Sequence, residues 1–209
     1  GLLSIASFFV LSCSENTNSS TTESSPKVVE KQEKISVPTF SEDSAFLFIE
    51  KQVSFGPRVP NSEAHQKCGD YFVEKLKSIG AEVTEQKFTA TAFDGKELQL
   101  RNIVGSINPT AKKRVLLAAH WDSRPFADQE TDTSKHYQPI DGANDGGSGV
   151  GVLMEVIRVA QLNKEKLNIG VDIILFDGED YGTPHFLSLI HISEPTRRTP
   201  ISYAVFCLK

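Results

Sequence analysis

The sequence predicts an α/β domain in which one helix connects two parallel strands. Two short runs of apolar residues, at 115–119 and 171–176, are typical of strands buried on both faces of a sheet. Between them, residues 147–162 place apolar side chains at helical spacing. A strand, a helix and a second strand in this order predict a right-handed parallel crossover, which is the repeating unit of α/β folds.

The composition fits a globular domain and excludes several other classes of protein. Of the 209 residues, 39% are hydrophobic and 23% are charged, which is sufficient for one buried core. The formal net charge is −5 and no basic stretch suits a polyanion, so we expect no nucleic-acid partner. No apolar run reaches the roughly 18 residues that a membrane-spanning helix needs. The three cysteines are far apart, so we expect no disulfide framework.

The first residues have the character of a targeting segment. Residues 2–11 are mostly apolar and lead directly into Ser12 and Cys13. Residues 1–13 resemble the end of a bacterial lipoprotein signal peptide, with 10–13 as the lipobox. This resemblance implies that Cys13 is acylated and that the protein is lipid-anchored in the bacterial cell envelope, facing the periplasm or the cell exterior. Residues 14–40 begin with a strongly polar stretch, so we expect a disordered tether.

Two amphipathic helices are expected at the start of the folded domain. Ser41 can cap the first helix, which the glycine and prolines of 56–60 end. Asn61 is the expected cap of the second helix, which ends near Gly80. Cys68 lies on the second helix and is expected to be a small buried side chain. The apolar positions expected to face the core are Ala45, Phe46, Phe48, Ile49, Val53, Tyr71, Phe72, Leu76 and Ile79.

A β-hairpin follows the two helices. Residues 83–93 read as a strand, and Asp94 with Gly95 forms a typical hairpin turn. The second strand then runs through Leu98 and Ile103. The polar stretch at 123–140 is long for a connection inside a domain, which indicates a functional loop.

The last residues differ in character from the rest of the chain. From Leu187 onward the sequence follows neither a helical nor a strand pattern. Residues 187–197 match the translation of a common sequencing-library adapter, and residues 201–208 resemble the translated tail that follows such an adapter. We therefore expect residues 187–209 to be an artefact, and the sequence-based prediction of the fold and the site does not use them. The domain then occupies residues 41–186, and the natural protein is expected to continue beyond Phe186.

Three acidic clusters stand where strands are expected to end. His120 and Asp122 follow the first buried strand, Asp145 precedes the helix, and Glu179 and Asp180 follow the second buried strand. Sites in α/β sheets form at the carboxyl ends of the strands, so these side chains should converge. Histidine and carboxylates together predict a metal site. A phosphate-binding loop at 147–151 is disfavoured, because there is no P-loop lysine and Asp145 would repel an anion.

The spacing within the clusters indicates separate roles. Side chains two apart on an extended segment point to the same side, so Asp122 can orient His120 or one of its neighbours. Of two adjacent carboxylates at a strand end, one can bind a metal while the other acts as a general base. A solvated acidic turn would explain Glu179 and Asp180 equally well if they stood alone, but not the three clusters together.

Four segments carry a resemblance to a known family. They are residues 119–125 (AHWDSRP), 142–151 (GANDGGSGVG), 175–182 (LFDGEDYG) and 55–60 (FGPRVP). Residues 41–186 resemble the M28 zinc peptidase family, and within it the bacterial lipoprotein-type glutaminyl cyclases. The resemblance implies a three-layer α/β/α fold with a mixed, mostly parallel central sheet, of which 41–186 would be the N-terminal part.

The resemblance also implies roles and a cofactor of one or two zinc ions. Asp145 would be the central ligand and would bridge two ions if both are present, and Asp180 would be a second ligand. His120 is a ligand in the two-zinc members and lies nearby in the one-zinc members. Asp122 would orient His120, and Glu179 would be the general acid and base. A last histidine ligand is expected downstream, so the chain as given is expected to be inactive.

The implied function is the conversion of N-terminal glutamine to pyroglutamate with release of ammonia. Its partners would be peptides or proteins that begin with glutamine. Two alternatives stay open. A zinc aminopeptidase would use the same residues to activate a water molecule, and a binding domain could keep the fold without catalysis.

Overall fold

The computed structural model describes residues 37–182 and the dipeptide 206–207. The chain divides into the units 1–36 and 37–209, and the fold is that of the second unit alone. The expected lipidation site Cys13, the tether up to residue 36 and the segment 183–205 lie outside the described residues. The anchor and the adapter assignment therefore stay predictions.

The centre of the fold is a mixed sheet with the strand order β1-β2-β4-β3-β5. The strands are β1 (Glu82–Thr91), β2 (Glu97–Ile107), β3 (Arg114–His120), β4 (Gly170–Phe176) and β5 (Phe206–Cys207). β1 pairs antiparallel with β2, and β2 pairs antiparallel with β4. β3 pairs in parallel with β4 and with β5. The α/β class and the mixed sheet are confirmed, and the described pairings are divided equally between parallel and antiparallel.

Each central strand was expected from its sequence. The hairpin turn forms at Asp94 and Gly95, where Gly95 has a φ of 82°. β3 and β4 are in register from the pair Arg114 and Gly170 to the pair His120 and Phe176, so the two strands end side by side. The residues that come after both strands are therefore held at the same edge of the sheet.

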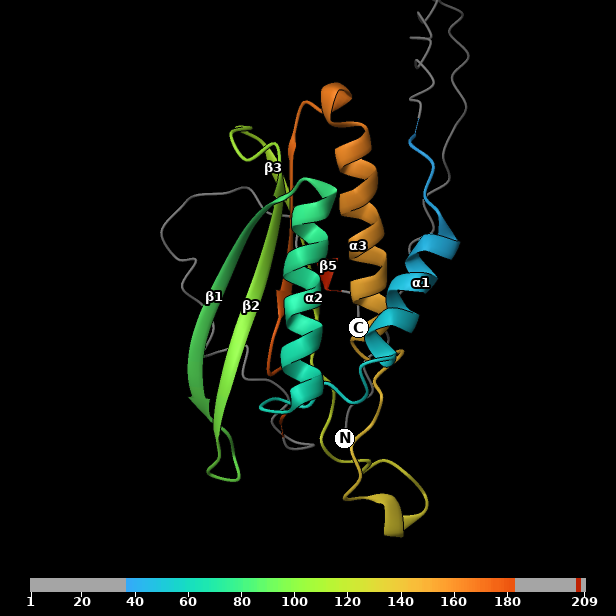
Figure 1. Cartoon of the computed structure of the whole chain (residues 1–209), viewed down its shortest axis with the longest axis vertical. Helices are drawn as coiled ribbons and strands as arrows, with labels where there is room; N and C mark the ends of the chain where they lie inside the picture. Colours follow the sequence, from blue (N-terminus) through green and yellow to red (C-terminus); the bar gives the residue numbers. More distant parts are fainter. Residues whose placement is uncertain (1–36, 183–205, 208–209) are drawn as a thin grey trace, which may run out of the picture. The chain divides into compact units, whose positions relative to one another are not determined.

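The helices α1 (Glu42–Val53), α2 (Glu63–Ile79) and α3 (Gly147–Leu162) pack in front of the sheet in the view of Figure 1. The bounds of α3 agree with the sequence prediction. Short 3-10 helices lie at Thr133–Lys135, inside the predicted functional loop, and at Lys164–Lys166. A second helical layer on the other face of the sheet is not among the elements that residues 37–182 form.

The helix caps show why two of the helices begin where they do. Ser41 caps α1, and its side chain accepts a hydrogen bond from Ser44 N at 3.2 Å. The predicted cap of α2 was wrong by one residue, because Ser62 rather than Asn61 accepts the hydrogen bond from His65 N. Asn61 has a φ of 73° and turns its side chain to β2, where it accepts from Gln99 N and donates to Glu97 O. Gly80 ends α2 in the left-handed conformation.

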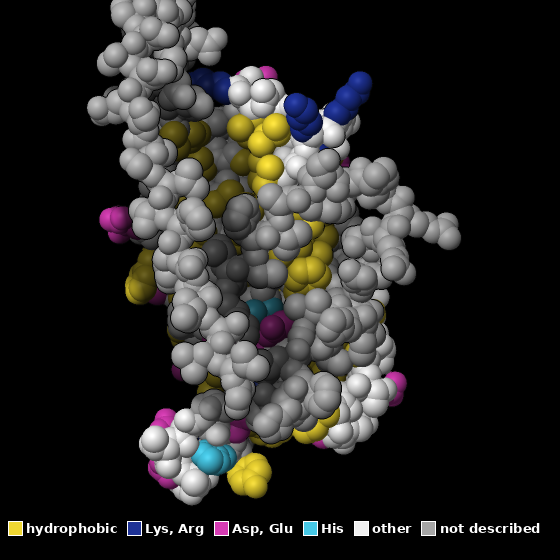
Figure 2. All heavy atoms as spheres, turned by 180° about the vertical axis from the view of Figure 1, so that it is seen from behind, with side chains coloured by type: hydrophobic (Ala, Val, Ile, Leu, Met, Phe, Trp, Pro, Cys, Tyr) yellow, Lys and Arg dark blue, Asp and Glu magenta, His cyan; other side chains and the backbone are white. Residues whose placement is uncertain are grey.

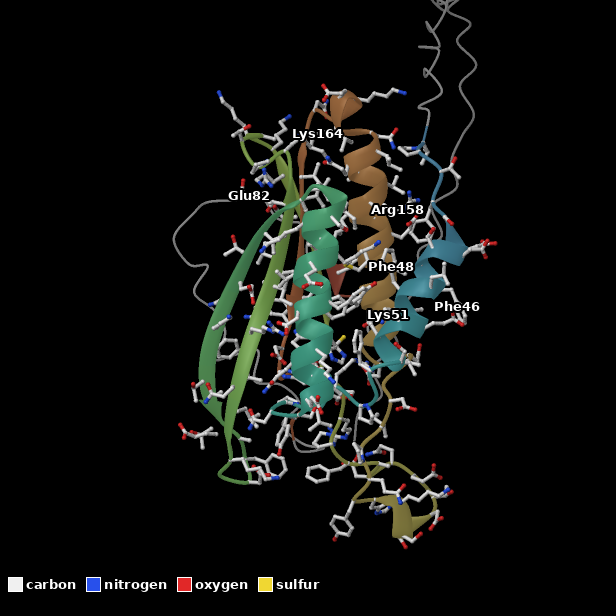
Figure 3. The ribbon with its side chains drawn as sticks, in the orientation of Figure 1. Phe46, Phe48, Lys51, Glu82, Arg158 and Lys164 are labelled. Atoms are coloured by element: carbon white, nitrogen blue, oxygen red, sulfur yellow. The ribbon has the colours of Figure 1, made fainter. Side chains whose placement is uncertain are left out.

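The main core lies between the sheet and the helices. It combines residues of alternate positions on β2 and β4 with the inner faces of α2 and α3. Cys68, Phe72 and Leu76 on α2 are fully buried, as predicted. Phe48 of α1 is buried, whereas Phe46 is 59% exposed, so its predicted place in the core was wrong (Figure 3). None of the helices in the described part has the length and hydrophobicity needed to cross a membrane.

Candidate active site

The end of β3 and the start of α3 bring the first two acidic clusters into contact. His120 is the last residue of β3, and its Nε2 lies 2.9 Å from Oδ1 of Asp145. Gly146, the N-cap of α3, donates from its backbone nitrogen toward the same Nε2 and Oδ1 at 3.3 Å. The predicted convergence of His120 and Asp145 is therefore present in the structure.

Asp122 joins the first cluster to the third. Its carboxylate is fully buried, and Oδ1 lies 3.4 Å from Nδ1 of His120. The two carboxylate oxygens also accept hydrogen bonds from the backbone of the third cluster, from Glu179 N at 3.1 Å and from Asp180 N at 2.9 Å. Asp122 thus lies beside His120, and it also fixes the loop that carries Glu179 and Asp180.

Glu179 lies close to the histidine. Its Oε2 is 3.9 Å from Nε2 of His120, and its side chain is 14% exposed. The backbone nitrogen of Glu179 donates to Asp122 at 3.1 Å, so the residue is held more closely at its main chain than at its carboxylate. A carboxylate that is positioned through its main chain and keeps access to solvent is suited to proton transfer.

The carboxylates set the protonation of the site. Burial alone would lower the pKa of His120, but the carboxylates of Asp122 and Asp145, with the charge of Glu179, raise it to about 10. Burial and the negative charges of Asp122 and Asp145 raise the pKa of Asp180 to about 7. An excess of negative charge therefore lies at this edge of the sheet.

Sequence reasoning missed the arginine that faces Asp180. Arg124 donates from Nη1 to Oδ1 and to the carbonyl of Asp180, both at 3.3 Å, and to the carbonyl of Gly182. The same guanidinium makes a bidentate ion pair with Asp128 at 2.6 and 2.8 Å. Arg124 belongs to the segment 119–125 that carried the family resemblance, and that membership was the only signal of its role.

A buried pair of His65 and Asp177 lies next to the third cluster. Nε2 of His65 lies 2.8 Å and 2.9 Å from the two carboxylate oxygens of Asp177. The His65 ring also stacks on Trp121, with 4.4 Å between the ring centroids. Burial raises the pKa of Asp177, and the hydrogen bond from His65 opposes this rise. α2 therefore contacts both the segment after β3 and the segment after β4.

The donor types at this edge fit a zinc ion. Histidine nitrogen and carboxylate oxygen are its usual ligands in catalytic sites. The buried Oδ2 of Asp180 has no hydrogen-bond partner among the described residues, which is unfavourable for a carboxylate oxygen unless a cation completes the site. Among residues 37–182, no three histidine, cysteine, aspartate or glutamate side chains stand together as a complete metal site. The predicted ligands Asp145, Asp180 and His120 therefore stay predictions.

The rear view shows the side of the sheet that the described helices leave uncovered. Figure 2 shows hydrophobic side chains over this face and a histidine next to an acidic side chain near its middle. The half-buried side chains of Leu116, Val104 and Phe176 belong to alternate strand positions that do not point into the main core. The described part of the fold thus has one well-packed face and one partly exposed face.

An α/β sheet with a histidine and four carboxylates at the edge where its parallel strands end and helix α3 begins defines a candidate metallohydrolase-like centre. A profile of peptidase family M28 matches residues 102–201, which include the histidine and all four of these carboxylates. The chain belongs to peptidase family M28.

Individual relatives carry more specific names. The glutaminyl-peptide cyclotransferase of Drosophila melanogaster is 26% identical over 165 residues, which are 74% of this chain and 44% of that protein. The crystal structure of Tannerella forsythia glutaminyl cyclase is 56% identical with a TM-score of 0.68, over 71% of this chain and 50% of that one. A Zn-dependent exopeptidase from Parabacteroides distasonis is 55% identical with a TM-score of 0.68, over 73% and 52%. The chain thus spans about half the length of these relatives.

Proposed function

We propose that the full-length protein containing this chain is a zinc-dependent glutaminyl-peptide cyclotransferase. It would convert an N-terminal glutamine to pyroglutamate and release ammonia. The observation that carries the proposal is the position of Glu179, whose carboxylate lies 3.9 Å from His120 beside the acidic centre. The 56% identity with the Tannerella forsythia glutaminyl cyclase supports this choice of substrate.

Glu179 is the residue that moves the proton in this reaction. The α-amine of the substrate attacks the carbon of its own side-chain amide, and the bond from that carbon to the amide nitrogen breaks. Glu179 accepts the proton that the amine loses and donates it to the departing nitrogen, which leaves as ammonia. The carboxylate ends in its starting form and no water is consumed.

The other residues hold the base and the proposed metal in place. Asp145 and Asp180 would bind zinc, and His120 would be a further ligand if two ions are bound. Zinc bound there supplies a Lewis acid that polarises the amide carbonyl of the substrate. Asp122 keeps Glu179 and Asp180 in position through their backbone nitrogens, at 3.1 and 2.9 Å.

A zinc aminopeptidase is the second candidate function. The name of the Parabacteroides distasonis relative, a Zn-dependent exopeptidase at 55% identity, is the observation that favours it. In that reaction Glu179 would take a proton from water, and the water oxygen would attack the carbonyl carbon of the first peptide bond. The bond from that carbon to nitrogen would then break, and Glu179 would pass the proton to the amine that leaves. A binding domain without catalysis is the third candidate, and the position of Glu179 argues against it.

The proposal extends to where the protein acts. Acylation of Cys13 would anchor the domain in the bacterial cell envelope, with residues 14–40 as the tether. Metabolic labelling with a radioactive fatty acid tests this, because a Cys13→Ser variant should lose the label. Label retained by that variant would contradict the anchor.

A paired assay separates the candidate functions. The full-length protein, loaded with zinc, is incubated with a glutamine-initiated peptide and with aminoacyl anilides. The cyclase predicts release of ammonia from the peptide and little cleavage of the anilides. Cleaved anilides without ammonia release would identify an aminopeptidase, and neither reaction would favour the binding domain. Activity that survives a strong chelator would refute the zinc requirement.

A further inference from the structure

Arg58 is an unusual residue within the described part of the fold. Its side chain is fully buried, although it carries a positive charge. Removing a guanidinium from water costs several kcal/mol, so a buried arginine needs well-placed partners. Arg58 lies in the segment 55–60, which the proposed mechanism does not use.

The guanidinium binds main-chain carbonyls of two separate loops. Nε donates to the carbonyl of Trp121 at 3.2 Å, in the loop after β3. Nη1 donates to the carbonyl of Asp141, and Nη2 donates to the carbonyl of Gly142 at 2.8 Å, in the loop that precedes α3. The backbone of Arg58 adds a fourth link, because its carbonyl accepts a hydrogen bond from Ser123 N at 3.2 Å.

These two loops carry the residues that meet at the candidate centre. His120 and Asp122 flank Trp121, and Asp145 comes three residues after Gly142. Gly142 also accepts a hydrogen bond from Gly147 N, the first residue of α3, at 3.1 Å. Through these hydrogen bonds Arg58 connects the segment after β3, which follows His120, to the segment before α3, which contains Asp145.

Gly142 is packed closely against the side chains of Arg58 and Ser123. Gly142 has a φ of 58°, and a Cβ added there would lie 3.0 Å from Nη2 of Arg58 and 2.8 Å from Cβ of Ser123. Only a residue without a side chain fits this close approach. The backbone of the loop before α3 is therefore in direct contact with the guanidinium of Arg58.

We propose that Arg58 is a positioning residue for the metal centre: its guanidinium holds the loop of His120 and Asp122 against the loop of Asp145, so that the proposed zinc ligand Asp145 keeps its place beside His120. The inference rests on the proposed function, because it requires zinc at this site. Arg58 acts on the ligands through their main chain and does not contact the substrate.

Arg114 offers a matched control at the other end of the same strand. It is the first residue of β3, whereas His120 is the last. Its guanidinium is also largely buried, and it binds Asp172 at 2.5 and 2.7 Å and the carbonyl of Asn108. Exchange of either arginine for lysine keeps the charge and removes the planar fork that binds several acceptors at once. Each variant therefore loses the simultaneous binding of several acceptors, Arg58 to main-chain carbonyls and Arg114 mainly to the carboxylate of Asp172, at opposite ends of the strand.

The test compares Arg58→Lys with Arg114→Lys in the full-length protein. The zinc dissociation constant is measured by competition with a chromophoric chelator, and the stability of the metal-free protein is measured by urea unfolding. Both variants should be less stable than the wild type. Arg58→Lys alone should bind zinc about 10- to 100-fold more weakly, as expected when the support of a metal ligand is lost. Excess zinc should restore much of its activity.

Three outcomes bear on the inference. Zinc affinity of Arg58→Lys within twofold of the wild type would overturn it. If that variant gives no cooperative unfolding transition, the titration is repeated on Arg58→Met, and failure of both to fold would show a folding role and also overturn the inference. If the wild-type protein cyclises glutamine peptides and the two arginine variants have equal zinc dissociation constants, only this inference is refuted. A wild-type protein that binds no zinc refutes the proposed function itself.

Discussion

Gly146 contacts His120 and can be changed without removing a functional side chain. A Cβ built at Gly146 would lie 2.3 Å from the carbonyl oxygen of His120 and 2.8 Å from its ring atoms Cε1 and Nδ1. Ordinary contacts begin near 3.4 Å, so the groups would have to separate by about 1 Å. Because one of them is backbone, the strain cannot be relieved by turning a flexible side chain.

We therefore predict that Gly146→Ala moves His120 away from Asp145, whose carboxylate is now 2.9 Å from Nε2. Overpacking of this kind lowers the free energy of unfolding by about 1–3 kcal/mol. A displacement of about 1 Å at a catalytic centre can lower the rate by about 100-fold. We expect kcat/KM for a glutamine-initiated peptide to fall by about that factor in the full-length protein.

Gly151→Ala is the control for this prediction. A Cβ there would lie 2.6 Å from Cγ1 of Ile49 and 2.8 Å from the carbonyl oxygen of Ala45, where α3 crosses α1. This variant should also lose stability by urea unfolding, while its kcat/KM stays within about twofold of the wild type. Equal kcat/KM for Gly146→Ala and Gly151→Ala, at equal loss of stability, would refute the importance of the His120 position.

Three further predictions concern two carboxylates of the candidate centre and the buried thiol of α2. Glu179→Gln should lower kcat by about 10²- to 10⁴-fold, because the carboxylate transfers the protons. The zinc content should stay unchanged, because Asp122 holds Glu179 through its backbone nitrogen. A kcat within tenfold of the wild type would exclude Glu179 as the base. Asp122→Asn should lower the free energy of unfolding by about 1–3 kcal/mol, because an amide cannot accept both backbone hydrogen bonds, and urea unfolding that matches the wild type would contradict this. Burial raises the pKa of Cys68 from 9.0 to about 12, so its thiolate fraction at pH 8 is about 1,000-fold below that of the unfolded chain. Peptide mapping after treatment with iodoacetamide should find Cys68 modified only in urea, and rapid modification of the native protein would disprove its burial.

The elements that the sequence predicted well are those with a strong local signal. The bounds of α3 and the course of β3 and β4 follow from uninterrupted apolar patterns between glycine-rich turns. The hairpin follows from Asp94 and Gly95, because an Asp-Gly pair between two strand-like segments is a strong local signal of a hairpin turn. The convergence of His120 and Glu179 follows from topology, because the parallel neighbouring strands β3 and β4 end at the same edge of the sheet.

The features that the sequence could not show depend on partners far along the chain. Asn61 is a good cap by composition, but its side chain instead pairs with β2, 36 and 38 residues away. Phe46 is as apolar as a core residue, but the way α1 packs buries Phe48 and leaves Phe46 exposed to solvent. The carbonyls that the Arg58 guanidinium binds lie 63, 83 and 84 residues away, and no periodicity indicates such contacts.

The most direct test of the central claim tracks one glutamine-initiated peptide through the reaction in water enriched in oxygen-18. The full-length, zinc-loaded protein should release one ammonia per peptide, and the product should contain no heavy oxygen, because the α-amine of the substrate is the nucleophile. Glu179→Gln should lower the rate of ammonia release by about 10²- to 10⁴-fold under the same conditions. Release of free glutamine that carries heavy oxygen would show that water attacks the first peptide bond, and the cyclase assignment would then be wrong.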